Sequence, residues 1–253
     1  MDSMLDYPPL VCALSFIILW RSALIGAFVR NKLGLLDENE RDVFGVVQAA
    51  LLTLLSLLVG FTFSMALGHY DQRKNYEEVE ANAIGTEYVR ADLLPTPDAT
   101  RVRELLKSYL GQRVLFYTTR DTMRLQEIDA RTAKLQNDLW SVVQSSAAAH
   151  STPTVALAVS GMNDVLNSQG YTQAAWRYRI PAEAWVLMTA IAISCNLLLG
   201  YGARRTGKIL FLILPLAIAI SFYLIADTDS PRRGLVSVRP LNLISLSQAL
   251  QAQ

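Results

Sequence analysis

The segment from residue 43 to residue 67 constrains the fold of this chain most strongly, because its 25 residues include no ionisable side chain. A helix rises about 1.5 Å per residue, so this segment is long enough to cross a hydrocarbon core about 30 Å thick. Residues 68–94 are charged, but no strong helix breaker appears before Pro95. The sequence therefore predicts a single helix that spans a membrane and then continues out of it.

Three further segments, residues 9–29, 182–201 and 209–226, are also apolar and long enough to cross a membrane. Hydrophobic residues make up 52% of the chain, which is high for a soluble domain and typical of a small membrane protein. A cleaved signal peptide carries positive charge before its apolar core, whereas Arg30 and Lys32 follow the first segment. We therefore interpret residues 9–29 as a retained transmembrane helix.

Residues 68–180 show the spacing of amphipathic helices and no alternating β pattern. Stop-and-start signals at residues 95–98 and 151–153 divide this segment, and Thr96 is expected to cap the helix that follows it. The predicted fold class is all-α: an integral membrane protein with four transmembrane helices and a helical extramembrane bundle inserted between helices 2 and 3. The expected division is 1–67 for transmembrane helices 1 and 2, 68–180 for the bundle, 181–226 for transmembrane helices 3 and 4, and 227–253 for a C-terminal tail with a short helix at 240–250.

The second transmembrane helix carries a stripe of small or polar residues with a period of four. Its members are Gln48, Leu52, Ser56, Gly60 and Ser64. Such a face differs from the usual lipid-facing surface, and Gln48, Ser56, Gly60 and Ser64 are therefore candidates for lining an ion pathway. Small residues also allow helices to pack closely in a membrane, so helix–helix contact explains the stripe as well, and both can occur at different depths.

A second polar stretch lies beyond the membrane, where Glu80, Asn82 and Glu87 are interleaved with small residues. Glu80 and Glu87 fall on one helical face, and Gly85 allows a close neighbour. Two interpretations remain open for Glu80, Asn82 and Glu87. They could face ions as part of a ring in an oligomer, or they could make a buried polar contact such as a salt bridge within one chain.

Two acidic residues, Asp227 and Asp229, follow the fourth transmembrane helix. Their carboxylates are potential oxygen ligands for a cation. They could instead pair with Arg232 or Arg233, or cap the helix. Both residues are therefore candidates for an ion-facing site or for a polar contact.

The sequence offers little support for catalysis, metal binding or nucleic-acid binding. Its net charge is +1, which gives no electrostatic reason to bind nucleic acid. His69 and His150 are the two histidines, and neither has a Cys or His partner at metal-ligand spacing. Catalytic triads and glycine-rich phosphate loops are not recognisable. We therefore expect no enzyme activity, no metal site and no cofactor.

The distribution of basic residues gives an expected orientation. With four crossings, both termini and residues 68–180 lie on one side, and two short turns lie on the other. Nothing basic precedes the first helix, and basic residues follow it, so the positive-inside rule places the short turns in the cytoplasm. The short turns contain Arg30, Lys32, Arg41, Arg204, Arg205 and Lys208. Residues 68–180 and both termini are then extracytoplasmic.

Taken together, these features resemble a bacterial family of bestrophin-like membrane proteins whose function is not established. The resemblance covers nearly the whole chain. It rests on Gly60-Phe61-Thr62-Phe63-Ser64, Tyr70-Asp71-Gln72-Arg73, Glu80-Ala81-Asn82-Ala83-Ile84-Gly85-Thr86, Arg179-Ile180-Pro181 and Asp227-Thr228-Asp229-Ser230-Pro231-Arg232-Arg233-Gly234. It implies a multi-pass protein of the bacterial inner membrane.

Similarity to the bestrophins themselves would imply a pentameric, anion-selective channel with a second helix that lines the pore. Bestrophins line the pore neck with bulky apolar residues one helical turn apart, whereas Phe61 and Phe63 are two residues apart and cannot share a face. Bestrophins also carry an acidic calcium-binding stretch after the fourth helix, where this chain has Asp227 and Asp229. Their large domain lies in the cytosol, which is opposite to the orientation that the charges favour here.

Two functions are consistent with these observations. The first is a homo-oligomeric ion channel in which transmembrane helix 2 lines the pathway. The second is a non-conducting membrane scaffold or sensor whose helical domain, residues 68–180, binds a protein partner. In both cases the lipid bilayer is the surrounding medium, and the first requires several copies of this chain.

Overall fold

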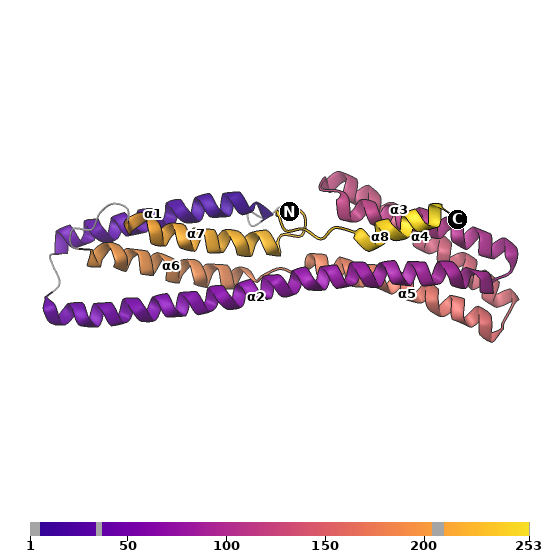
Figure 1. Ribbon diagram of the computed structural model, residues 1–253, viewed down its shortest axis with the longest axis horizontal. Helices are drawn as coiled ribbons and strands as arrows, with labels where there is room; N and C mark the ends of the chain where they lie inside the picture. The colour runs from indigo at the N-terminus through magenta and orange to yellow at the C-terminus, as the bar shows by residue number, and fades with distance from the viewer. Residues whose placement is uncertain (1–5, 34–36, 204–209, 253) are drawn as a thin grey trace. The chain divides into compact units, whose positions relative to one another are not determined.

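The computed structural model describes residues 6–33, 37–203 and 210–252, and all regular secondary structure in these ranges is helical (Figure 1). This confirms the predicted all-α fold class. The elements are α1 (Pro8–Leu33), α2 (Glu38–Arg90), the 3-10 helix η2 (Ala91–Leu93), α3 (Thr96–Thr118), α4 (Thr122–Ala149), α5 (Pro153–Arg177), α6 (Ala182–Gly202), α7 (Leu210–Asp229) and α8 (Leu241–Gln251). The predicted basic turn with Arg204, Arg205 and Lys208 lies outside the described residues.

Four stretches of helix are long and apolar enough to cross a membrane, as the sequence predicts: Pro8–Lys32 in α1, Glu40–Leu93 in α2 and η2, Pro153–Gly202 in α5 and α6, and Phe211–Asp229 in α7. Helix α2 continues without interruption for 53 residues, so the apolar segment and the charged segment belong to one helix. It begins with a capping box: Asp37 Oδ1 accepts from the Glu40 N–H at 2.8 Å, and Glu40 Oε2 accepts from the Asp37 N–H at 3.1 Å. It ends at Arg90, slightly earlier than predicted, where η2 tightens the last turn before Pro95.

The chain divides into two compact units, which we call unit 1 (residues 1–70 and 179–237) and unit 2 (residues 71–178 and 238–253). In unit 1, α1 packs along both α6 and α7 (Figure 1). Its core is apolar and includes Leu19, Met188 and Phe222. Two residues from α2, Leu55 and Ala66, belong to the same core.

Glycine brings α1 and α6 together in unit 1 by direct backbone contact. A Cβ on Gly26 would lie 2.0 Å from the Leu197 carbonyl oxygen, and a Cβ on Gly200 would lie 1.9 Å from the Ala23 carbonyl oxygen. Neither helix could approach so closely with a larger residue at these positions. This contact is the packing device expected of membrane helices, in which small residues substitute for a hydrophobic driving force.

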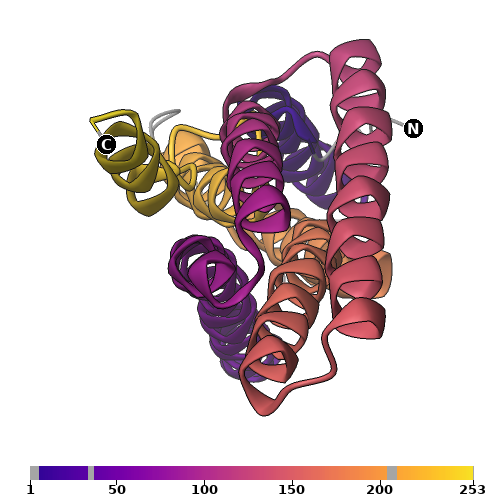
Figure 2. The same ribbon diagram turned by 90° about the vertical axis from the view of Figure 1, so that its right-hand side faces the viewer.

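Unit 2 is a bundle in which α4 lies beside both α3 and α5 (Figure 2). Fully buried apolar side chains such as Leu106, Leu139 and Met162 form its interior. Thr152 caps α5 by accepting from the Val155 N–H at 3.3 Å. The predicted cap of α3 is wrong: Thr96 is the first residue of that helix, and no side chain caps it. Pro95 takes the N-cap position with an extended backbone, and Pro97 lies in the first turn, where its missing N–H has no helical partner to lose.

The short C-terminal helix predicted at 240–250 is α8, which packs against α3 in unit 2. Gly85 of α2 does have a close neighbour, because Leu246 of α8 lies 3.2 Å from where its Cβ would be. The buried carboxylate of Glu77 accepts from the Leu243 N–H at 3.0 Å and from Asn242 Nδ2 at 2.7 Å. No side chain of α8 caps the start of this helix. The Glu77 carboxylate of α2 instead accepts a hydrogen bond from its N-terminal backbone, at the Leu243 N–H.

Candidate functional site

The polar stripe of α2 lies largely on an uncovered face of the helix. Ser56, Gly60 and Ser64 are exposed, whereas Gln48 and Leu52 are half-buried. The buried positions of this segment, Leu55, Thr62 and Ala66, lie on the face opposite to Gly60 and Ser64. Leu52 packs against the core of unit 1, so only the part of the stripe from Ser56 to Ser64 is separate from this contact.

The membrane segment of α2 is covered much less than the other spans. Only 6% of its most apolar window is buried, against 28% to 44% for the other three candidate spans. No atom lies within 4 Å of a Cβ placed on Gly60, among the residues that the structure describes. Gly26 and Gly200, in contrast, hold backbones in contact. Packing within one chain therefore does not explain the exposed part of the stripe, at Ser56, Gly60 and Ser64.

Phe61 and Phe63 lie on different faces, as their spacing requires. Phe61 is 64% exposed, and Phe63 is half-buried against the core of unit 1. The serine hydroxyl of the stripe at Ser56 donates to the Thr53 carbonyl oxygen at 2.8 Å. Such back-bonding lets a hydroxyl lie in an apolar helix without an unpaired donor, while its oxygen can still accept.

Glu80 lies in the interior of unit 2, where it forms an ion pair with Arg113 of α3. Both side chains are fully buried. The second carboxylate oxygen, Oε2, accepts from Tyr117 OH at 3.2 Å and from Thr172 Oγ1 at 3.1 Å. The guanidinium of Arg113 also stacks over the Phe116 ring at 4.5 Å. This network links α2, α3 and α5.

The electrostatics of this network follow from burial and from the two charges. Burial alone would lower the pKa of Arg113, but the Glu80 carboxylate outweighs it and the pKa is raised. Burial, reinforced by Glu80, raises the pKa of Tyr117, so this hydroxyl remains a donor. We did not identify Arg113, Tyr117 or Thr172 from the sequence. The position of Arg113 could have indicated a buried ion pair, because this arginine falls within the apolar stripe of α3.

Glu87 is also fully buried, but neither of its carboxylate oxygens has a hydrogen-bond partner within the described part of the chain. Burial raises its pKa from 4.5 to about 8; Arg90 acts to lower it, and Asp164 acts to raise it further.

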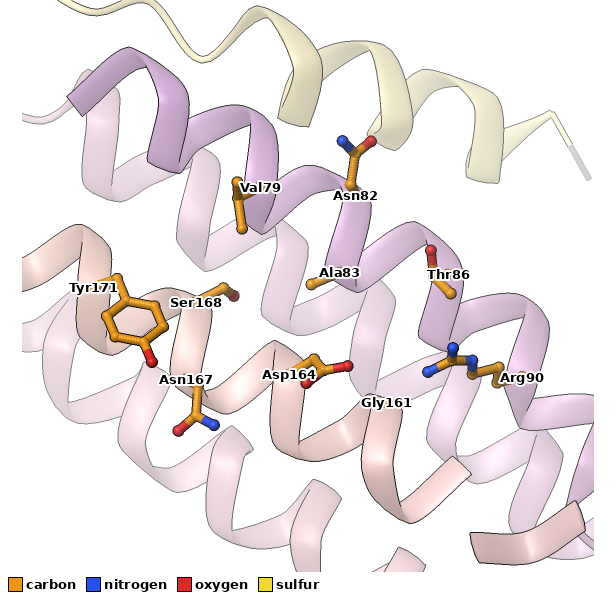
Figure 3. Close-up of a pocket in the computed structure, with 10 residues that line it drawn as sticks. All are labelled: Val79, Asn82, Ala83, Thr86, Arg90, Gly161, Asp164, Asn167, Ser168 and Tyr171. Atoms are coloured by element: carbon orange, nitrogen blue, oxygen red, sulfur yellow. The ribbon is translucent and has the colours of Figure 1, made fainter. Parts of the chain in front are cut away.

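Asn82 lies on the exposed side of α2 and lines a groove between α2 and α5 (Figure 3).

Asp227 and Asp229 are buried at the end of α7 in unit 1. Asp227 accepts from the Leu235 N–H at 2.7 Å and from the Val236 N–H at 3.0 Å. It therefore anchors the chain that follows the helix. The backbone at Gly234 also passes close to the end of α7, since a Cβ on Gly234 would lie 2.2 Å from the Asp227 carbonyl oxygen.

Asp229 holds three segments of unit 1 together. Its carboxylate accepts from His69 Nδ1 at 2.9 Å and from the Ile180 N–H at 3.2 Å, and Arg179 lies 3.6 Å away. Burial lowers the pKa of Arg179, and Asp229 acts in the opposite direction. Arg179 also pairs with Asp6. In the ranges that the structure covers, no three His, Cys, Asp or Glu residues gather as a metal site.

These features define a multi-pass helical membrane protein with a helical extramembrane unit. The Bestrophin-like domain model matches residues 15–243, and the chain belongs to this family.

Its fold is similar to that of crystal structures of a bacterial bestrophin homologue from Klebsiella pneumoniae. One variant of that protein gives a TM-score of 0.65 at 12% identity, covering 94% of this chain and 97% of that chain. Another gives 0.64 at 13% identity, covering 99% and 98%. No curated protein matches the chain.

Proposed function

We propose that this protein forms a homo-oligomeric ion channel in which the membrane segment of α2 lines the pathway. The observation that carries the proposal is the uncovered stripe with Ser56, Gly60 and Ser64, on the least buried membrane helix of the chain. An uncovered stripe of hydroxyls and glycine suits water or ions better than lipid tails. Membership of the Bestrophin-like family supports the same function. Gln48 would extend the lining toward the start of α2.

Recording currents from purified protein in planar bilayers tests this proposal. We expect a conductance that a charged thiol reagent alters in Ser56→Cys. The matched control is Leu54→Cys, because Leu54 is also exposed and is two residues away, but lies about 160° around the helix from Ser56. No conductance under varied anions, calcium and pH would overturn the proposal, and so would equal modification effects in both variants.

The number of copies around the pathway can be measured separately. Mass photometry or native mass spectrometry in detergent should give a single closed oligomer, since a pathway along one helix requires a ring of copies. A monomer that conducts would contradict the proposed arrangement of α2. A monomer that does not conduct would instead favour the second function below.

We further propose that the protein lies in the bacterial inner membrane, with residues 68–180 and both termini outside the cytoplasm. Support comes from the basic residues that follow α1, Arg30 and Lys32. Both native cysteines, Cys12 and Cys195, lie within candidate membrane spans, so one introduced cysteine can report orientation. An impermeant maleimide should label Gln144→Cys in intact cells. Labelling only after cell disruption would place unit 2 in the cytoplasm instead.

A second candidate function is a non-conducting scaffold or sensor that binds a protein through unit 2. It is favoured by apolar side chains that remain exposed there, including Val89, Leu157 and Tyr178. Photocrosslinking from these positions in cells should recover a second protein. Recovery of adducts between copies of this chain alone would remove the support for this function.

A further inference from the structure

The groove between α2 and α5 in unit 2 has a volume of about 440 Å³. Figure 3 shows that its two ends differ in chemistry. At one end Arg90 and Asp164 face each other from the two helices, beside Gly161. At the other end lie Val79 and Tyr171. The groove is of the size that small-molecule sites commonly have.

The charged end contains groups that the protein leaves available. Among the described residues, neither Arg90 nor Asp164 makes a hydrogen bond or a close ion pair. The buried carboxylate of Glu87, which interacts electrostatically with both residues, is also without a hydrogen-bond partner. Glu87 Oε2 lies 2.0 Å, and Arg90 Nη1 2.7 Å, from the point that a Cβ on Gly161 would occupy. The absence of a side chain at Gly161 therefore leaves room for the Glu87 carboxylate beside Arg90, behind the wall of the groove.

We propose that this groove binds an α-amino acid with an apolar or aromatic side chain. The guanidinium of Arg90 would donate to the ligand carboxylate, and Asp164 would accept from the ligand ammonium. Asn82 and Asn167 also line the groove, and the side chain of the ligand would lie against Val79 and Tyr171. A zwitterion fits because the rim presents one positive and one negative group.

The charge state of Glu87 gives the site a distinguishing pH dependence. With a pKa of about 8, Glu87 is mainly neutral at pH 7, and Arg90 is then free to bind a carboxylate. At higher pH the ionised Glu87 competes with the ligand carboxylate for Arg90. The negative charge of Asp164 on α5 opposes this ionisation and so helps to keep Glu87 neutral at pH 7. Binding should therefore weaken between pH 7 and pH 9. In Glu87→Gln this component should disappear, because the amide does not ionise.

Isothermal titration calorimetry of the full-length protein in detergent tests the proposal with leucine and phenylalanine as probes. We expect binding of at least one probe at pH 7. N-acetyl-leucine and leucinamide, which lack the ammonium and the carboxylate respectively, should bind at least about tenfold more weakly, because each leaves a charged group unpaired. Arg90→Gln and Asp164→Asn should cause losses of similar size.

Two exposed residues outside the groove provide matched controls: Arg101→Gln and Glu78→Gln should bind as the unaltered protein does. The absence of binding by both probes would overturn the proposal. It would also be overturned if N-acetyl-leucine and leucinamide bound as well as leucine, a result that does not depend on the folding of any variant. Conductance is not required in any arm, so failure here is distinct from failure of the channel proposal.

Discussion

The two halves of α2 differ in composition and in how far other helices cover them, although they form one continuous helix. The membrane half has no ionisable residue and remains largely uncovered, whereas the outer half buries Arg73, Glu77, Glu80 and Glu87. Lipid tails are as apolar as leucine, so exposed apolar residues in the membrane carry no penalty that folding must remove. In water the outer half must be covered by other helices, and an acid that becomes covered must find a partner, as Glu80 does, or keep its proton, as Glu87 does at pH 7.

The same contrast distinguishes the contacts that hold each unit together. In unit 1, Gly26 and Gly200 allow direct contact of two backbones. In unit 2, a buried ion pair and its hydrogen bonds link α2 to α3 and α5. The contact in unit 1 depends on the absence of a side chain, and the contact in unit 2 depends on complementary charge. Stability should therefore be sensitive to added side-chain volume at the unit 1 contact and to loss of one charge at the unit 2 contact.

The largest effect is expected from Arg113→Met, which leaves the Glu80 carboxylate buried without its counter-charge. The free energy of unfolding should fall by about 3–5 kcal/mol, as for other buried pairs that lose one partner. Chemical denaturation followed by circular dichroism in detergent would measure it. The double variant Arg113→Met with Glu80→Leu should recover part of the loss. A loss below about 1 kcal/mol, the range of exposed pairs, would contradict the role of this network.

Glu87→Gln should stabilise unit 2, with an effect that depends on pH. The folded chain holds the proton of Glu87 to about pH 8, whereas an unfolded glutamate releases it near 4.5. The unaltered protein therefore loses stability as pH rises between these values, and the variant does not. We expect an advantage on the order of 3 kcal/mol at pH 9 that vanishes near pH 4. Glu78→Gln, which replaces an exposed acid, serves as the control in the same denaturation series.

Gly200→Val should destabilise unit 1 by about 2 kcal/mol, because the added side chain would force α1 and α6 apart. Thermal unfolding in detergent would report the change as a lower midpoint. Gly60→Val is the matched control, since Gly60 also lies in a candidate membrane span but has no atom within 4 Å of its Cβ position among the described residues. If the two variants lost the same stability in the isolated chain, the distinction between packing glycines and the stripe would be wrong. In the oligomer, Gly60→Val should change conductance instead.

The smallest effect is expected at the start of α8. Glu77→Gln removes the charge that faces the N-terminal N–H groups of this helix and should cost about 1 kcal/mol, the usual value of a cap. Hydrogen exchange should increase locally in α8, at Leu243 in particular, while α4 remains protected. Uniform exchange throughout unit 2 would show that Glu77 supports the whole bundle rather than one helix.

The sequence was sufficient for the helices and for several of their ends. The capping box of Asp37 with Glu40 and the cap of Thr152 are encoded within three residues, and both are present. The cap at Asp121, which accepts from the Met123 N–H, could have been recognised by the same rule. The site residues were harder, because their partners lie far away in sequence: Arg113 is 33 residues from Glu80, and Thr172 is 92 residues from it.

The sequence by itself determined that this chain is an all-helical membrane protein with α2 extending out of the bilayer. That follows because lipid offers no hydrogen bonds, so each spanning segment must satisfy its own backbone locally. Only the tertiary structure decided which polar residues are paired, which glycine is packed and which is open. Those outcomes depend on which helix faces align, and alignment is a property of distant segments packing together.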